Sequence, residues 1–340
     1  MRSYDLYNND VLVAEFQTQG GTLHSFTPLR KELLPMQVAN ASADGFALWL
    51  QNRSIDLNTF QHRQLVYALT GSRDKISVAI ATHMFSISDT FTCFDKAEFI
   101  PRGQLCNPLD QAQVSDFILV SSDTSLKNTG MVTPNASTDG CFTKTWKYER
   151  GEWWLYKLQS ADATKSECEI SKVLRACGYS AAEYEYDGCV RTRIKTRNFV
   201  GDNEFFEPYE SVRFMFDDKS DDEQVVYDNI ASLGSSFELE WRRILLADAL
   251  FMNTDRHMRN FGVIRSAVTG KLLRMAPNFD NNQAYLANPG GTYSERMLTN
   301  FFQSYHPKKQ DHNDLAQLVD ACEHIDYMKQ AAEVGRRIIS

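Results

Sequence analysis

Two acidic residues and one amide in the C-terminal half have the types and spacing that phosphoryl transfer requires. Asp255 and Asn260 are five residues apart in NTDRHMRNFG, and Asp280 follows in APNFDNN. Such a reaction needs a carboxylate that orients the attacking hydroxyl, a neutral oxygen ligand for a metal ion, and a second carboxylate that joins metal and phosphates. Mg²⁺ prefers oxygen ligands and keeps several waters, so this set is a sufficient protein contribution. Residues 248–280 therefore predict a phosphoryl-transfer site.

A long helix is predicted just before this site. Apolar residues follow Ser235 at helical spacing, namely Phe237, Trp241, Ile244, Leu245 and Phe251. Glu238 completes a capping-box pattern with Ser235. The helix should end near Met252, which leaves Asp255 in the loop that follows.

A hairpin is predicted after that loop. FGVIR and LLRMAP read as two strands joined by a turn at Thr269 and Gly270. The second strand would return Asp280 to the side of Asn260, so that residues distant in the sequence share one ion.

The two segments together resemble the catalytic and metal-binding segments of HipA-like serine/threonine kinases. The family pattern is approximately N-x-D-x-H-x-x-N-F followed by P-x-x-D, and both parts occur here. The resemblance covers residues 126–300 and implies an α+β, protein-kinase-like fold with two lobes. It also implies ATP and Mg²⁺ as cofactors, with Asp255 as the catalytic base and His257 against the nucleotide. Asn260 and Asp280 would be the metal ligands.

A strand and a helix upstream supply charges for the nucleotide. CFTKTWKYERGEWWLYKLQ predicts a hairpin that turns at an Arg-Gly pair, with Lys157 on its second strand. From its position before an acidic helix, Lys157 is predicted to bind the α- and β-phosphates. That helix is predicted over residues 164–177, with Gly178 as its C-terminal cap. Glu167 is the preferred ion-pair partner of Lys157, and Glu169 remains the alternative.

The hydroxyl-rich loop before this hairpin is the predicted phosphate loop. Ser137, Thr138, Asp139 and Gly140 offer hydroxyls and backbone N–H groups, and they resemble the flexible phosphate loop of the family. In some relatives a hydroxyl of this loop is autophosphorylated, which ejects the loop from the site. The resemblance implies Ser137 or Thr138 as that acceptor.

A second hairpin is predicted by AAEYEY, an Asp-Gly turn and CVRTRIKT. Its last strand should lead into the hinge that holds adenine, near residues 194–197, which places Lys195 and Thr196 beside the nucleotide. The alternation in RTRIKTR is interpreted as one exposed basic strand face, formed by Arg191, Arg193, Lys195 and Arg197, rather than as a nucleic-acid patch.

The whole chain is long enough for several subdomains, because 43% of its 340 residues are apolar. Residues 1–125 are predicted to form a mixed α/β accessory subdomain without a catalytic constellation. Residues 126–230 are predicted to form the nucleotide-binding lobe, and residues 231–340 a helical lobe with the catalytic and metal-binding loops. The acidic segment FDDKSDDEQ is interpreted as a solvated connector.

Charge, hydropathy and cysteine usage restrict the class of protein. The formal net charge of −8 argues against direct nucleic-acid binding, which needs a basic surface. No apolar run approaches the roughly 18 residues of a membrane span, and the start lacks the apolar core of a signal peptide. A cytoplasmic protein without membrane contact is therefore expected. The seven cysteines include no CxxC pair and are interpreted as reduced structural thiols.

These features favour an ATP- and Mg²⁺-dependent protein serine/threonine kinase. One alternative is a non-catalytic nucleotide-binding module with a regulatory or toxin–antitoxin role, which the intact catalytic set of Asp255, Asn260 and Asp280 disfavours. Another is a kinase for a small molecule or lipid, because acceptor choice depends on groove shape. If the toxin role of the family applies, the resemblance implies a small helix-turn-helix antitoxin as partner, to which DNA binding would belong.

Overall fold

A computed structural model describes residues 1–55, 60–96, 98–120, 132–137, 143–284, 295–325 and 328–339. The chain divides into two compact units, and each of them is built from three separate stretches of sequence. The first unit comprises Met1–Leu158, Val200–Glu207 and Ile264–Leu273. The second unit comprises Gln159–Phe199, Pro208–Val263 and Arg274–Ser340.

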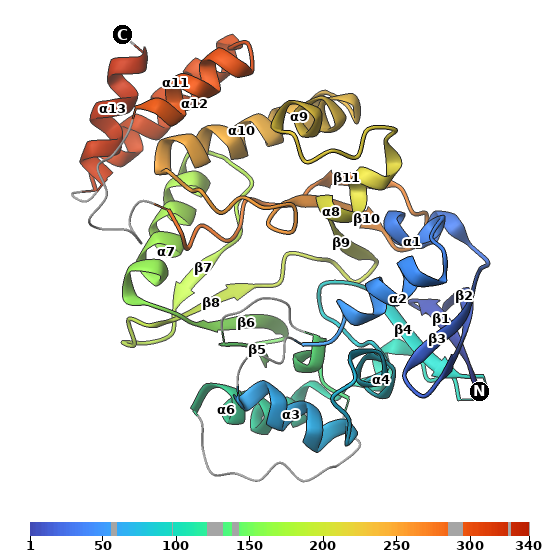
Figure 1. Cartoon of the computed structure of the whole chain (residues 1–340). Helices are drawn as coiled ribbons and strands as arrows, with labels where there is room; N and C mark the ends of the chain where they lie inside the picture. The colour runs from blue at the N-terminus through green and yellow to red at the C-terminus, as the bar shows by residue number, and fades with distance from the viewer. Residues whose placement is uncertain are drawn as a thin grey trace. The chain divides into compact units, whose positions relative to one another are not determined.

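The first unit combines an N-terminal sheet, short helices and a hairpin (Figure 1). Its strands are β1 (Arg2–Asn8), β2 (Val11–Gln19), β3 (Thr22–Pro28), β4 (Phe91–Asp95), β5 (Thr143–Glu149) and β6 (Glu152–Leu158). Its helices are α1 (Met36–Ala39), α2 (Ala43–Gln51), α3 (Phe60–Thr70), α4 (Lys75–Ala81), α5 (Arg102–Leu105) and α6 (Ala112–Val120). Short 3₁₀ turns are η1 (Lys31–Leu33), η2 (Pro108–Gln111) and η3 (Pro134–Ser137).

The N-terminal sheet has the strand order β3-β2-β1-β4 with antiparallel neighbours. Alternate residues of β1 and β2 are buried, as expected for a sheet with one face on a core. Helix α2 begins at the N-cap Ser42 and buries Phe46, Trp49 and Leu50 in that core. Phe46 lies 5.2 Å from Phe16 between ring centroids, so the helix and the sheet share one aromatic cluster.

Three further strands, β9 (Glu204–Pro208), β10 (Gly262–Ser266) and β11 (Leu272–Met275), form a sheet in the order β11-β10-β9. Each contributes residues to both units. β10 and β11 confirm the hairpin predicted after the loop of Asp255 and Asn260. Its turn includes Gly270, which has a φ of 70°.

A buried arginine in β10 holds the N-terminal segment of the first unit. Arg265 donates to the Glu207 carboxylate at 2.6 Å and to the carbonyls of Leu34 at 3.0 Å and Glu32 at 2.9 Å. Glu207 also accepts from the backbone N–H of Met36 at 2.5 Å. The pair is almost fully buried, with side-chain exposures of 5% and 1%. The ion pair therefore joins two strands to the segment before α1.

Gly270 makes this close approach possible. A Cβ atom at this position would lie 1.9 Å from the Glu32 carbonyl oxygen, whereas at Gly151 it would meet nothing within 4 Å. Both glycines have a positive φ, 70° and 86° respectively. Only Gly270 is thus required by packing as well as by backbone conformation.

We expect Gly270→Ala to destabilise the protein more than Gly151→Ala. Both variants carry a left-handed alanine, which costs roughly 1–2 kcal/mol. Only Gly270→Ala adds a clash with the backbone of Glu32, which should cost about 1–3 kcal/mol more, as overpacking of a core does. Urea denaturation would measure the difference, and equal midpoints for the two variants would contradict the close approach at Glu32.

The hairpin of β5 and β6 confirms the predicted strand pair. Glu149 pairs with Glu152 across the turn, and both turn residues, Arg150 and Gly151, have a positive φ. Two such residues are the requirement of a tight hairpin turn that matches the strand twist. Lys157 of β6 faces Lys144 of β5 and is 4% exposed.

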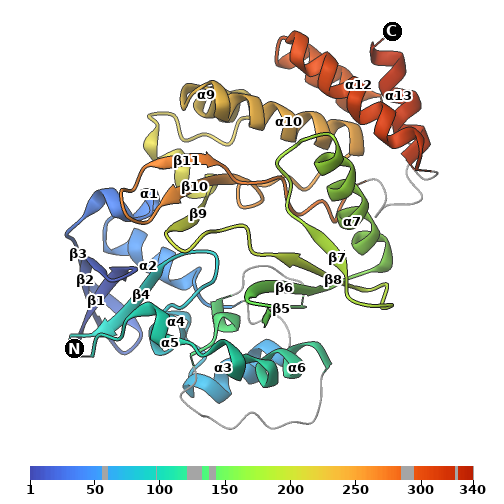
Figure 2. The ribbon, with the colours of Figure 1, turned by 180° about the vertical axis from the view of Figure 1, so that it is seen from behind.

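The second unit is mainly helical and carries a two-stranded hairpin. Its elements are α7 (Ala161–Ala176), β7 (Tyr184–Tyr186), β8 (Arg193–Arg197), α8 (Tyr209–Val212), η4 (Arg213–Met215), α9 (Glu223–Ser232), α10 (Ser235–Phe251), α11 (Arg296–Ser304), α12 (Lys309–Glu323) and α13 (Lys329–Ile339). Figure 2 shows α12 and α13 side by side. None of the described helices is long and apolar enough to cross a bilayer.

Helix α10 ends where the sequence predicted, but it begins differently. Its last residue is Phe251, followed by Met252 in the left-handed conformation with a φ of 53°. The predicted capping box is wrong, because Gly234 is the N-cap and no side chain caps the helix. Glu238 is instead bound by Lys308 and by the Tyr227 hydroxyl. These contacts lower the pKa of Glu238, the Lys308 hydrogen bond being the larger cause.

Helix α7 starts three residues earlier than predicted, at Ala161, with Ser160 as its N-cap. Gly178 follows its end with a φ of 75°, as the predicted C-terminal cap requires. β7 and β8 pair antiparallel and confirm the second hairpin. The interpretation of an exposed basic face is wrong for Arg193 and Lys195, since both are half-buried and face the carboxylates of residues 187 and 185.

Candidate active site

The loop after α10 holds Asp255 and Asn260 in one hydrogen-bonded turn. Asn253 accepts the backbone N–H of Asp255 at 3.3 Å. The carbonyl oxygen of Asp255 accepts from the backbone N–H of His257 at 2.9 Å and from Nδ2 of Asn260 at 3.0 Å. The amide of Asn260 thus donates within the loop through its nitrogen. Its oxygen is the atom suited to a cation.

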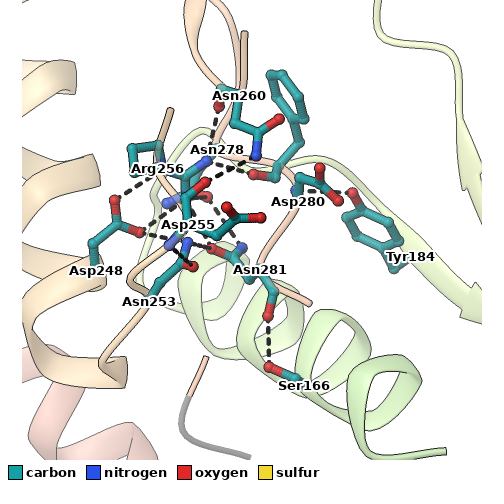
Figure 3. Close-up of polar contacts among 11 residues, drawn as sticks. Ser166, Tyr184, Asp248, Asn253, Asp255, Arg256, Asn260, Asn278, Asp280 and Asn281 are labelled. Atoms are coloured by element: carbon teal, nitrogen blue, oxygen red, sulfur yellow. Dashed lines mark hydrogen bonds and ion pairs between the residues drawn. The ribbon is translucent and has the colours of Figure 1, made fainter. Parts of the chain in front are cut away.

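The segment that carries Asp280 is held by its backbone. Asn278 forms a parallel bridge with Ala181, and its carbonyl accepts the N–H of Ala182 at 2.9 Å. Asp280 donates its N–H to the Tyr184 hydroxyl at 3.1 Å. Ser166 of α7 donates to the carbonyl of Asn281 at 2.6 Å. The backbone of residues 278, 280 and 281 is therefore held by a hydrogen bond at each residue (Figure 3).

Arg256 joins the loop to that segment, and Figure 3 shows its guanidinium at the centre of the contacts. Its Nη1 donates to the carbonyls of Asn260 at 2.8 Å and Phe279 at 2.6 Å. Its Nη2 donates to the side-chain oxygens of Asn278 at 3.1 Å and Asn281 at 2.9 Å. Arg256 thereby links the backbone of Asn260, one predicted metal ligand, to that of Phe279, the residue before the other predicted ligand, Asp280.

Asp248 near the end of α10 provides the countercharge. It accepts from Nε and Nη2 of Arg256, both at 2.8 Å, and from Nδ2 of Asn253 at 3.1 Å. The two charged side chains are 8% and 7% exposed. Burial is the largest single influence and acts to lower the pKa of Arg256, but the charge and hydrogen bond of Asp248, together with Asp280 and Tyr184, raise that pKa overall. The guanidinium therefore stays charged.

The predicted catalytic residues differ in exposure. Asp255 and His257 lie at the surface, Asp280 is half-buried, and Asn260 is buried. His257 accepts the backbone N–H of Arg259 on Nδ1 at 3.2 Å. A loop with one exposed carboxylate beside a buried amide is accessible to a substrate hydroxyl.

The residues present fit an Mg²⁺ ion by their chemistry. The predicted ligands Asn260 and Asp280 offer an amide oxygen and a carboxylate, and this ion prefers oxygen over nitrogen or sulfur. Within the described ranges, no group of three or more His, Cys, Asp or Glu side chains is arranged to hold a metal. The predicted donor set is one amide oxygen and one carboxylate, completed by waters and phosphates.

The two candidate partners of Lys157 have different surroundings. Glu167 is fully buried in α7 and accepts from Nε2 of Gln159 at 2.7 Å. Glu169 is bound by Lys172 at 3.0 Å on a more exposed part of the helix. Lys157 belongs to the first unit and both glutamates to the second. The ion pair with Lys157 stays a prediction.

Of the remaining predicted nucleotide contacts, the structure describes Lys195 and Thr196 in β8 and Ser137 in η3. Lys195 is half-buried with its Nζ 3.7 Å from Glu185, and Thr196 is 7% exposed. The hydroxyl of Thr196 has no hydrogen-bond partner in the part of the chain that the structure describes. Ser137 donates to the Phe85 carbonyl at 2.7 Å. Thr138, Asp139 and Gly140 lie outside the described residues.

Several residues of the site were not predicted from the sequence. They are Ser166, Tyr184, Asp248, Asn253, Arg256, Asn278 and Asn281. One signal for them was the density of amides around Asp280 in APNFDNN. Another was the position of Arg256 directly after the predicted base. Tyr184 and Ser166 gave none, because they contact the site only through tertiary structure.

Comparison with known proteins identifies the fold. No family model and no curated protein matches the sequence. The HipA toxin of Shewanella oneidensis MR-1, solved as a complex of HipA, HipB and operator DNA, is 11% identical with a TM-score of 0.59, covering 99% of this chain and 95% of that chain. The Helicobacter pylori proinflammatory kinase CtkA is 12% identical with a TM-score of 0.41, covering 58% of this chain and 88% of that chain.

The chain has a HipA-like, protein-kinase-like fold. The likeness to HipA extends over nearly the whole chain, including the residues before the predicted nucleotide-binding lobe. The α+β, two-lobed fold class predicted from the sequence is thereby confirmed.

We expect Asp248→Asn to lower the free energy of unfolding by about 3–5 kcal/mol, because it leaves the buried Arg256 charge without its partner. Urea denaturation would measure the loss. Asp228→Asn is the matched control, since Asp228 is exposed on α9 and such changes cost within about 0.5 kcal/mol.

A second variant separates the ion pair from the packing around it. Adding Arg256→Gln to Asp248→Asn should restore part of the lost stability, because neither charge then remains buried alone. A double variant less stable than the wild type by the sum of the costs of the two single changes would show that the two residues act independently.

Proposed function

We propose that the protein is an ATP- and Mg²⁺-dependent kinase that phosphorylates serine or threonine residues of a protein. The observation that carries this proposal is the bridge made by Arg256, whose Nη1 donates to the carbonyls of Asn260 and Phe279. It links the backbone of Asn260 to the residue before Asp280, which supports a shared site for the amide and the carboxylates that phosphoryl transfer requires. The HipA-like fold supports the proposal.

Each residue has a chemical role in this proposal. Asp255 orients the acceptor hydroxyl and accepts its proton, which its exposed position permits. Asn260 and Asp280 hold Mg²⁺ through oxygen atoms, and His257 lies against the nucleotide. ATP with Mg²⁺ supplies the phosphoryl group and neutralises its charge.

The other predicted contacts complete the nucleotide site. Lys157, paired with Glu167, binds the α- and β-phosphates, and Lys195 and Thr196 lie beside the adenine. Ser137, Thr138, Asp139 and Gly140 form the phosphate loop, in which Ser137 or Thr138 is the proposed autophosphorylation site. Catalysis would then rest on positioning and charge rather than on covalent chemistry.

A small antitoxin-like protein is the proposed regulatory partner. The HipA structure is a complex of HipA, HipB and operator DNA, which supports this assignment. The net charge of −8 disfavours direct contact of this chain with DNA. The proposed location is the cytoplasm, where ATP, a protein acceptor and such a partner are available.

We expect Asp255→Asn to reduce transfer of labelled γ-phosphate from ATP to protein by about 10²- to 10⁴-fold, because a positioned general base contributes this much. Asp280→Asn should abolish most transfer by weakening the metal site. The measurement is the rate of label incorporation into the chain and into a panel of proteins in the presence of Mg²⁺. Asp228→Asn, an exposed acid on α9, should transfer at the wild-type rate.

Two outcomes would change the proposal. Binding of Mg²⁺ and ATP without label on any protein would favour either a non-catalytic module or a small-molecule acceptor, which a screen of lipids and metabolites would separate. Failure to bind ATP with Mg²⁺ at all would overturn the assignment of the site.

A further inference from the structure

Asp280 has a backbone conformation that an aspartate adopts only with support. Its φ is 62°, in the left-handed region that is unfavourable for residues with a Cβ atom. Aspartate tolerates this region better than most residues do, but the right-handed region remains lower in energy. A change between the two would turn the side chain away from its present direction. The metal-binding carboxylate therefore depends on what holds this residue.

The neighbours of Asp280 are fixed through their carbonyl groups. Arg256 donates to the carbonyl of Phe279 at 2.6 Å, and Ser166 donates to that of Asn281 at 2.6 Å. The backbone N–H of Asp280 itself is bound by Tyr184, whose hydroxyl oxygen lies 3.1 Å away. Tyr184 thus contacts the backbone of Asp280 directly (Figure 3).

The hydroxyl of Tyr184 is itself held in place. The residue belongs to β7, pairs with Thr196 of β8, and is 5% exposed. Its ring packs in a cluster with Cys168, Ala182, Ile194, Tyr186, Phe199 and Phe279. A closely packed ring on a paired strand has little freedom to move, so its oxygen is a fixed acceptor.

We infer that the Tyr184 hydroxyl is a positioning group for metal binding by Asp280. By accepting the Asp280 N–H, it stabilises the left-handed conformation in which the carboxylate is available to Mg²⁺. Tyr184 does not touch the ion, and it acts through the backbone of the ligand. The inference rests on the proposed function, because it assumes that Asp280 is a metal ligand.

Tyr184→Phe tests this inference with the loss of one oxygen atom. We expect the affinity for Mn²⁺, in the presence of a non-hydrolysable ATP analogue, to fall about 5- to 10-fold, the effect of one hydrogen bond. The affinity for the analogue without metal should stay at the wild-type value. Calorimetric titration measures both quantities, and a cooperative melting transition would show that the variant is folded.

Tyr179→Phe is the matched control. Tyr179 lies in the same unit, is also 5% exposed, and its hydroxyl has no hydrogen-bond partner in the described part of the chain. Removal of this buried hydroxyl should leave the Mn²⁺ affinity unchanged. The comparison separates the loss of a specific contact from the loss of any buried tyrosine oxygen.

Asp280→Asn distinguishes the failure of this inference from the failure of the proposed function. If Asp280→Asn weakens Mn²⁺ binding but Tyr184→Phe behaves like Tyr179→Phe, the positioning role is wrong and the metal site stands. The positioning role would also be overturned if Tyr184→Phe lowered the affinity for the nucleotide analogue by the same factor in the presence and in the absence of metal. If Asp280→Asn binds Mn²⁺ as the wild type does, the assignment of the metal site fails.

Discussion

The candidate site depends on one buried ion pair. Arg256 and Asp248 are nearly inaccessible to water, and the guanidinium forms hydrogen bonds with two backbone carbonyls and two amide oxygens besides the carboxylate. A buried charge is costly unless it is paired and its donors are satisfied. Arg256 meets both conditions in this arrangement, so moving either loop away from it would leave a charge or a donor unpaired.

The first unit also contains a buried arginine–carboxylate ion pair that binds backbone carbonyls. Arg265 pairs with Glu207 in the interior and donates to the carbonyls of Leu34, Glu32 and Gly270. The planar guanidinium presents five donors in a fixed geometry, so one arginine can satisfy several carbonyls that no strand or helix pairs. In each unit, irregular backbone is ordered by a buried arginine rather than by regular secondary structure.

Local patterns gave most of the secondary structure correctly. The hairpin of β5 and β6, the end of α10 near Met252 and the cap at Gly178 depend on neighbouring residues, and the sequence predicted them. The start of α10 was wrong, because Glu238 binds Lys308, which lies 70 residues away, instead of capping the helix. The predicted exposure of Arg193 and Lys195 was wrong for a related reason. Strand alternation shows which residues share a face, but not which acidic side chains lie against that face.

By itself, the sequence determined the types and order of the groups that could transfer a phosphoryl group, and their likeness to a kinase family. The sequence predicts Asp255, Asn260 and Asp280 because few residue types can act as a general base or as an oxygen ligand for Mg²⁺, and these three occur at the spacing of the kinase family. Only the tertiary structure decided how these groups are held. Asp248, Tyr184 and Ser166 act from other elements through single contacts, and a contact between distant residues leaves no periodic or local trace in the sequence.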